Sequence, residues 1–237
     1  IAAPAKPSPA ALTRAGELLR GAKRPIAVLG ANAMRLADFG ALRALIERHG
    51  IPFATTTMAK GLIDEDHPFS LGCIERACRK VQRAMLATAD LIVGLGYDTI
   101  EVEYEAWIGA VPLLHIDFAP ADTDGSVRGE HSVTGSLDSS LAHLAALAPI
   151  GNAWTAAEIA AHGANFQRAL RPAGAGLVPH AVIDVVRRVL PREGVLAFDV
   201  GAHTHQIASQ WTAHAPRTFL ITNGWSSMGF GLPAAIA

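Results

Sequence analysis

The chain has 237 residues, of which 50% are hydrophobic and 17% are charged, a composition typical of an ordinary globular protein. Its 20 Lys and Arg residues nearly balance 21 Asp and Glu residues, so the chain creates no long-range field that would attract a nucleic-acid backbone. No apolar run reaches the length of a membrane span, and the first residues lack the basic-then-apolar pattern of a signal peptide. We therefore expect no nucleic-acid partner, no membrane partner and a cytoplasmic location.

The first part of the chain alternates short apolar, β-branched runs with amphipathic helical patterns, as expected for parallel strands joined by crossover helices. A first helix can begin at Ser8 or Pro9, which are good helix-starting residues. The further elements that we expect are strands at 26–30, 53–56, 91–94, 113–117 and 132–134, and helices at 39–50, 77–87 and 137–147. The predicted fold class over residues 1–150 is α/β, a Rossmann-like parallel sheet with helices on both faces.

Residues 151–177 are predicted to form a linker that carries a helix and contains the run Arg171-Pro172-Ala173-Gly174-Ala175-Gly176. A second, incomplete α/β unit is expected over residues 178–237. Its predicted elements are a helix at 179–190, a strand at 195–199, a helix at about 205–211, a strand at 219–222 and a final apolar helix. That helix is uncharged and lacks a covering segment, and the chain has no initiator Met. We therefore expect this chain to be a piece of a longer polypeptide.

Two strand ends in the first part carry glycine-rich turns, Gly30-Ala31-Asn32-Ala33 and Gly94-Leu95-Gly96-Tyr97-Asp98. Backbone N–H groups at such turns can receive a phosphate, and ligands of open α/β sheets bind beyond the carboxyl ends of the strands. Neither turn contains GxGxxG, and a tight strand-to-helix turn needs glycine in any case, which favours a structural reading. If the two strands are neighbours, the turns share one crevice.

Other reactive side chains give weaker signals. The alternating Glu101, Glu103 and Glu105 are expected on a solvated face rather than as an acid/base pair, since nothing nearby marks a reacting group. His203 and His205 lack a third metal ligand, so we expect no metal there. The chain's two cysteines, Cys73 and Cys78, have neither CxxC nor zinc-site spacing and are expected to be reduced and inert.

The most informative residues follow the two predicted strands of the second unit. The first loop reads Phe198-Asp199-Val200-Gly201-Ala202-His203, and the second runs from Thr222-Asn223-Gly224 through Trp225-Ser226-Ser227-Met228 to Gly229-Phe230-Gly231-Leu232-Pro233-Ala234-Ala235. The second string resembles the "GG(x)xxMGxGLPAAIG" segment of thiamine-diphosphate enzymes of the acetolactate synthase group, and the first resembles their "DVGxH". The first part of the chain resembles the central domain of that family.

The resemblance implies a cofactor role for eight residues. Val200 and Gly201 offer backbone N–H groups to a diphosphate, His203 can donate to its oxygens, and Ala202 completes the implied set in this loop. Small residues in the second loop let the backbone approach a flat ring, and Met228 matches the residue that wedges under the cofactor and imposes its bent shape. The implied set in this second loop is Gly224, Ser226, Ser227 and Met228.

The family's chemistry implies thiamine diphosphate and Mg²⁺ as cofactors and a 2-keto acid as substrate, with pyruvate giving 2-acetolactate and CO₂. The glutamate that activates the cofactor and the Gly-Asp-Gly…Asn segment that holds the magnesium are not in this chain. We therefore expect no catalytic or metal-binding residue in it and no activity from it alone. The family's active sites lie between subunits, which implies a homodimer or homotetramer.

Departures from the pattern bear on the subfamily. Flavin-containing biosynthetic enzymes carry an Arg-Phe-Asp-Asp-Arg-like run after the strand predicted here at 91–94, whereas this chain has Gly96-Tyr97-Asp98-Thr99-Ile100-Glu101 and a later Trp107, as in the flavin-free catabolic type. We expect no FAD. Ala202 and Trp225-Ser226-Ser227 match neither type closely, so the choice between carboligase and decarboxylase stays open. A nucleotide-binding or purely structural Rossmann-like module is the alternative from another functional class.

Overall fold

The computed structural model describes residues 4–102, 107–122 and 127–237. Six parallel strands form one sheet in the order β3-β2-β1-β4-β5-β6. They are β1 (Pro25–Leu29), β2 (Phe53–Thr55), β3 (Ser70–Cys73), β4 (Leu91–Leu95), β5 (Leu113–Asp117) and β6 (Gly129–Thr134). The order reverses between β1 and β4, the place where open α/β sheets bind ligands. The predicted Rossmann-like fold class is confirmed.

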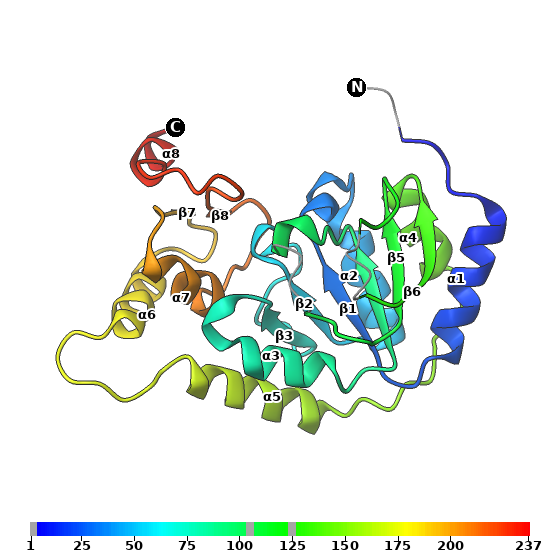
Figure 1. The fold of residues 1–237 in the computed structure, drawn as a ribbon, viewed down its shortest axis with the longest axis horizontal. Coiled ribbons are helices and arrows are strands. Elements are labelled where there is room, and N and C mark those ends of the chain that lie inside the picture. Colours follow the sequence, from blue (N-terminus) through cyan, green and yellow to red (C-terminus); the bar gives the residue numbers. More distant parts are fainter. Residues whose placement is uncertain (1–3, 103–106, 123–126) are drawn as a thin grey trace.

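Five helices cover the two faces of this sheet (Figure 1). They are α1 (Pro9–Gly21), α2 (Phe39–His49), α3 (Arg79–Leu86), α4 (Leu137–Ala145) and α5 (Ala156–Ala169). Successive strand residues point to opposite faces, so in β1 Ala27 and Leu29 join the core under α1, α2 and α4. Ile26 and Val28 join the core with α5, whose Ile159 is buried there. This explains why the strands read as unbroken apolar runs.

Capping residues fix the helix ends, and at the start of α1 and the end of α2 they are the ones that the sequence predicts. The Ser8 side chain accepts a hydrogen bond from the N–H of Ala11 and caps α1. The Asp38 side chain caps α2, which ends at Gly50 in the left-handed conformation that favours glycine. At α5, Thr155 and Glu158 form a capping box. These caps satisfy N–H groups that the helices leave free.

Two features of the first unit differ from the sequence prediction. The short edge strand β3 was missed because its mixed sequence, Ser-Leu-Gly-Cys, carries no clear apolar period. The helix expected in the linker is α5, and it lies against β3: its His162 Nε2 donates to the carbonyl of Leu71 over 3.1 Å. Four short 3₁₀ helices follow strands or precede α3: η1 (Ala31–Arg35), η2 (Thr57–Ala59), η3 (Arg76–Cys78) and η4 (Ile100–Val102).

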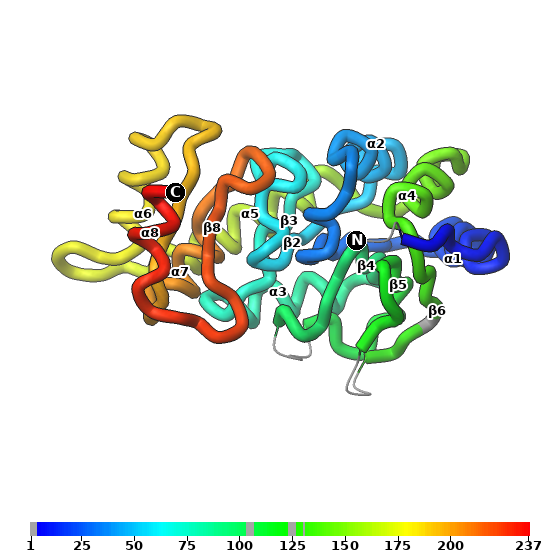
Figure 2. Tube along the Cα trace, turned by 90° about the horizontal axis from the view of Figure 1, so that it is seen from above, coloured from blue at the N-terminus to red at the C-terminus, as the bar shows by residue number. Residues whose placement is uncertain are grey.

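The second unit lies beside the β3 edge of the first, as both views of the chain show (Figures 1 and 2). Its elements are α6 (Pro179–Val189), β7 (Leu196–Ala197), α7 (Ala202–Gln210), β8 (Phe219–Leu220) and α8 (Gly231–Ile236). The two strands are shorter than predicted, and α7 begins three residues before the expected start. Among the described residues, no helix is both long and apolar enough to cross a bilayer.

Candidate functional site

The two motif loops of the second unit leave the same end of one small sheet. β7 and β8 pair in parallel, with Leu196 opposite Phe219 and Ala197 opposite Leu220. Because parallel strands point the same way, the loops after Phe198 and after Ile221 both start at the carboxyl end of this pair. The side-by-side arrangement that the sequence predicts for these turns is therefore present.

Asp199 joins the two loops directly. Its carboxylate accepts hydrogen bonds from the N–H of Val200 at 2.8 Å and of Gly229 at 2.9 Å, and from that of Gly231 at 3.3 Å. These N–H groups, the nearest one that of Val200, hold the pKa of the Asp199 carboxyl below its usual range. The carboxylate is thus ionised at neutral pH and ties the end of the second loop to the start of the first.

The first loop offers fewer free N–H groups than the sequence implies. The N–H of Val200 is taken by Asp199, and the N–H of Gly201 donates to Thr204 Oγ1 over 3.0 Å. The first N–H groups of a helix have no intrahelical acceptor, so those of Ala202 and His203 at the start of α7 are the ones that an anion can reach. The ring of the exposed His203 lies over Gly201, where a Cβ atom would come within 2.8 Å of it.

The second loop is exposed along the residues with predicted cofactor roles. Gly224 has a positive φ of 85°, and a Cβ atom placed there would meet nothing within 4 Å. Ser226 also has a positive φ, 49°, while Ser227 is exposed beside it. Met228 is 82% exposed. An open backbone surface with a large thioether beside it is one that a flat ring could approach.

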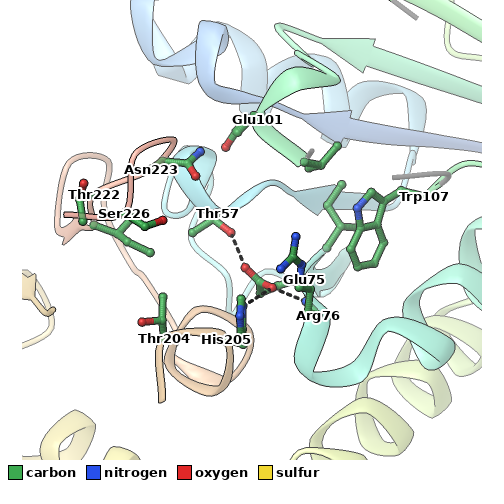
Figure 3. A pocket seen from close by; sticks show the side chains of 13 residues that line it. Thr57, Glu75, Arg76, Glu101, Trp107, Thr204, His205, Thr222, Asn223 and Ser226 are labelled. Carbon is green, nitrogen blue, oxygen red and sulfur yellow. Dashed lines mark hydrogen bonds and ion pairs between the residues drawn. The ribbon is translucent and has the colours of Figure 1, made fainter. Parts of the chain in front are cut away.

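A pocket of about 80 Å³ lies where this second loop faces the first unit (Figure 3). It opens at the carboxyl ends of β2, β3 and β4, so strand-end loops of both units surround it. Its polar lining includes Thr57, Glu75, Glu101, His205, Asn223 and Ser226. Ser226 is thus brought to the pocket, whereas Met228 lies outside its lining.

A hydrogen bond between His205 and Glu75 crosses this pocket and links the two units. His205 Nδ1 lies 3.0 Å from Glu75 Oε1, and Thr57 Oγ1 donates to Glu75 Oε2 over 3.4 Å, as the dashed lines of Figure 3 show. Sequence reasoning missed Glu75 and Thr57 because they follow β3 and β2 far from the motif loops. It considered His205 only as a metal ligand. Thr57 and Glu75 each follow a strand of the parallel sheet, and this position is the signal that could have identified them.

Glu101 corrects a prediction of the sequence. It was expected on a solvated face, but its carboxylate accepts from the N–H of Ala31 at 3.0 Å and from that of Met58 at 2.8 Å. Burial raises the pKa of Glu101 in spite of these bonds. The loop after β4 therefore folds back over the starts of η1 and η2. Glu103 and Glu105 lie outside the described residues.

The two glycine turns of the first unit meet, as their strands are neighbours. Their contact is too close for side chains: a Cβ atom at Gly30 would lie 2.3 Å from the carbonyl oxygen of Gly96. A small polar crevice follows beyond them, where Asn32 Nδ2 donates to Asp117 Oδ2 over 3.0 Å. The buried His115 next to Asp117 donates from Nε2 to the carbonyl of Tyr97, 3.0 Å away. Glycine is needed here for packing.

One cluster of carboxylates and histidine has the shape of a metal site. Oxygens of Asp64 and Asp66 and a ring nitrogen of His214 lie within 4.8 Å of one another. The Arg192 guanidinium already pairs with both carboxylates, at 3.1 Å from Asp66 Oδ2 and in direct contact with Asp64. The Arg192 guanidinium thus offsets part of the negative charge of this cluster, which joins the second unit to the first.

Comparison with protein families gives this geometry its context. Residues 12–144 match the family model described as thiamine pyrophosphate enzyme, central domain, and residues 199–237 match the C-terminal TPP binding domain. The chain belongs to the thiamine pyrophosphate enzyme family. The predicted resemblance is confirmed, and the motif loops after β7 and β8 fall in the family's TPP binding domain.

Several curated members of this family are similar over nearly the whole chain. The acetolactate synthase large subunit of Parasynechococcus marenigrum is 27% identical over 98% of this chain and 39% of its own length. A probable 2-ketoarginine decarboxylase of Pseudomonas aeruginosa is 28% identical over 97% of this chain and 41% of its own length. The acetolactate synthase isozyme 1 large subunit of Escherichia coli is 29% identical over 94% of this chain and 40% of its own length. The chain thus spans about two fifths of the length of these relatives.

Proposed function

We propose that this chain is part of an acetolactate synthase-like enzyme that uses thiamine diphosphate to convert two pyruvate molecules into 2-acetolactate and CO₂. The observation that carries the proposal is the parallel β7–β8 pair, which brings both motif loops to one end, where Asp199 joins them. The small pocket beside the second loop supports a small 2-keto acid as substrate, since about 80 Å³ leaves little room for a long side chain.

Each loop has its own task in this proposal. The N–H groups of Ala202 and His203 and the imidazole of His203 hold the diphosphate, because the start of α7 carries a partial positive charge. The open backbone from Gly224 to Ser227 lies against the ring system, and the Met228 thioether supports it from one side. When bound, thiamine diphosphate supplies the electron sink that decarboxylation of a 2-keto acid requires.

The pocket residues orient the substrate. Asn223 and His205 can hydrogen-bond its carboxylate and carbonyl oxygens, and the first unit forms the opposite wall of the pocket, where Glu75 holds His205. The magnesium that accompanies the diphosphate is expected to bind through the Gly-Asp-Gly…Asn segment, which this chain does not contain. We further propose that FAD is not used and that the enzyme is a homodimer or homotetramer that acts in the cytoplasm.

The experiment uses the full-length protein that contains this chain, supplied with thiamine diphosphate, Mg²⁺ and pyruvate. We expect 2-acetolactate, measured as acetoin after acid treatment, and loss of most activity in His203→Ala, with a higher cofactor concentration needed for half activity. Release of acetaldehyde in place of acetoin would identify a decarboxylase. Absence of both products, together with absence of cofactor binding in calorimetry, would overturn the proposal.

A second candidate is a nucleotide-binding module, which the crevice between β1 and β4 favours. Against it stands Glu101, whose carboxylate takes the N–H groups of Ala31 and Met58 beside this crevice. Calorimetric titration of the chain with ADP, FAD and NAD separates the two functions. Micromolar binding of any of them would favour the module, and flavin absorbance in the purified full-length protein would contradict the FAD-free proposal.

A further inference from the structure

Asp199 is the one residue of the two motif loops that bonds to both. One carboxylate oxygen accepts from the N–H of Val200 at 2.8 Å, and both oxygens lie 2.9 Å from the N–H of Gly229. The N–H of Gly231 adds a bond of 3.3 Å. Hydrogen bonds from N–H groups to an ionised carboxylate are stronger than those between neutral groups.

The end of the second loop is pressed against the end of β7. Gly229 has a positive φ of 87°, a conformation that favours glycine, and a Cβ atom at Gly231 would lie 2.9 Å from the backbone N of Asp199. Gly229 is therefore favoured by the backbone conformation of the turn, and Gly231 by its close contact with the end of β7. The Asp199 carboxylate supplies the acceptor for the N–H groups of this turn, including that of the buried Gly231.

Met228 directly precedes this turn and is 82% exposed, so packing of its own side chain does not hold it in place. Its position is set through the backbone, from Gly229 and hence from Asp199. On the basis of the proposed function, we propose that Asp199 is a positioning residue: its carboxylate fixes the 229–231 turn and thereby aims Met228 at the bound cofactor. Asp199 itself does not touch the reacting atoms.

The test compares Asp199→Asn with Asp90→Asn. Asp90 is a matched control because its carboxylate also accepts two backbone N–H groups, of Lys23 at 2.7 Å and of Arg24 at 2.9 Å, but lies in the first unit away from the motif loops. In both variants an amide NH₂ replaces one acceptor oxygen and meets the N–H donors. If the Asp199 carboxylate only stabilised the fold, as that of Asp90 does, the two variants would give the same results in both measurements.

The first measurement needs no cofactor. Amide hydrogen exchange of the 223–231 segment, read by mass spectrometry, should speed up about tenfold in Asp199→Asn and stay unchanged in Asp90→Asn. Unchanged exchange in Asp199→Asn would overturn the proposal. Should Asp199→Asn fail to fold, Gly231→Ala takes its place, since it keeps the carboxylate but displaces the turn, and the same comparison applies.

The second measurement uses the full-length protein saturated with thiamine diphosphate and Mg²⁺. We expect Asp199→Asn to bind the cofactor within a few-fold of the unaltered protein, while exchange of the thiazolium C2 proton for deuterium slows about tenfold or more, because misplaced groups lose alignment rather than affinity. Asp199→Glu should restore part of the rate. A normal exchange rate in Asp199→Asn would overturn the positioning role, whereas failure of the unaltered protein to bind the cofactor would overturn the proposed function instead.

Discussion

Lys60 and Glu65 form a buried ion pair at the boundary between the two units. Lys60 Nζ lies 2.9 Å and 2.8 Å from the two Glu65 carboxylate oxygens, and the side chains are 1% and 6% exposed. Glu65 also accepts from the N–H of Ala213 at 2.8 Å and from the Thr55 hydroxyl at 3.2 Å. Every oxygen of this buried carboxylate therefore has a partner, which a buried charge requires.

Lys60→Met should lower the free energy of unfolding by about 3–5 kcal/mol, because it leaves the Glu65 charge buried without its cation. Urea denaturation followed by fluorescence measures this change. Arg43→Met is the control, since the side chains of the Arg43–Glu47 pair are 59% and 44% exposed, and loss of this solvent-screened pair should change the free energy of unfolding far less. Equal losses of the free energy of unfolding in the two variants would show that burial does not make the Lys60–Glu65 pair more important for stability.

Single residues divide into those that the sequence places correctly and those that it does not. Cys73 and Cys78 are free and buried, and burial raises the pKa of Cys73 to about 12, in line with the predicted inert thiols. Glu101 and Lys60 could not be placed from the sequence, which shows them as ordinary surface charges. The partners of Glu101 are 43 and 70 positions away, and the Lys60–Glu65 pair, although local, is buried only because the second unit covers it.

At the scale of elements, α5 is a helix predicted to lie in the linker that instead packs against the sheet of the first unit. Its Ile159, His162 and Phe166 are buried against the β3 side of the sheet. Gly72 of β3 leaves room for α5, since a Cβ atom there would lie 2.6 Å from the Phe166 ring. The packing of this helix thus depends on a glycine of the strand that the sequence analysis missed.

His162 makes this docking sensitive to pH. Burial lowers the pKa of His162 below its usual value of 6.5, so the unfolded chain takes up this proton at a higher pH than the folded one. Stability should therefore be lost as the pH falls below about 6.5, measured as the free energy of unfolding in urea at a series of pH values. In His162→Gln, whose amide can still donate to Leu71, the decline should be shallower. An unchanged slope in that variant would contradict this assignment.

Short strands explain where element boundaries were misplaced. β7 and β8 each have two residues, although the predicted strands had five and four. The apolar runs continue past the pairing because Phe198 and Ile221 pack in the core of the second unit beyond its sheet. Apolar periodicity reports burial, and only backbone pairing defines the strand.

At the scale of the whole molecule, loops of the first unit contact the second unit at the end of α7 and at the segment that follows this helix. Besides Lys60–Glu65, the N–H of Glu65 donates to the carbonyl of Ala213 over 3.1 Å. Gly61, with a positive φ of 80°, lies so near the backbone of the second unit that a Cβ atom on it would come within 2.1 Å of the Ala215 carbonyl oxygen. This contact positions the motif loops over the strand ends of the first unit.

The exposed segment 172–177, which joins the units without helix or strand, should be the first site of elastase cleavage. We expect the two resulting pieces to elute together in gel filtration, because buried polar contacts hold the units. Addition of urea should separate them and show that cleavage is complete. Separate elution without urea would contradict a stable interface and, with it, a fixed pocket between the units.

The sequence by itself determined the α/β class, the start of α1, the end of α2 at Gly50 and the two motif loops, because these depend on periodicity and on residues close in the chain. The tertiary structure alone decided which strand ends meet, that Glu101 turns inward, that Asp199 holds the 229–231 turn and that Glu75 reaches His205. Each of these contacts joins residues separated by 30 or more positions, or buries a charge that solvent would otherwise surround. Their energies depend on distance and burial in space, which a linear pattern does not contain.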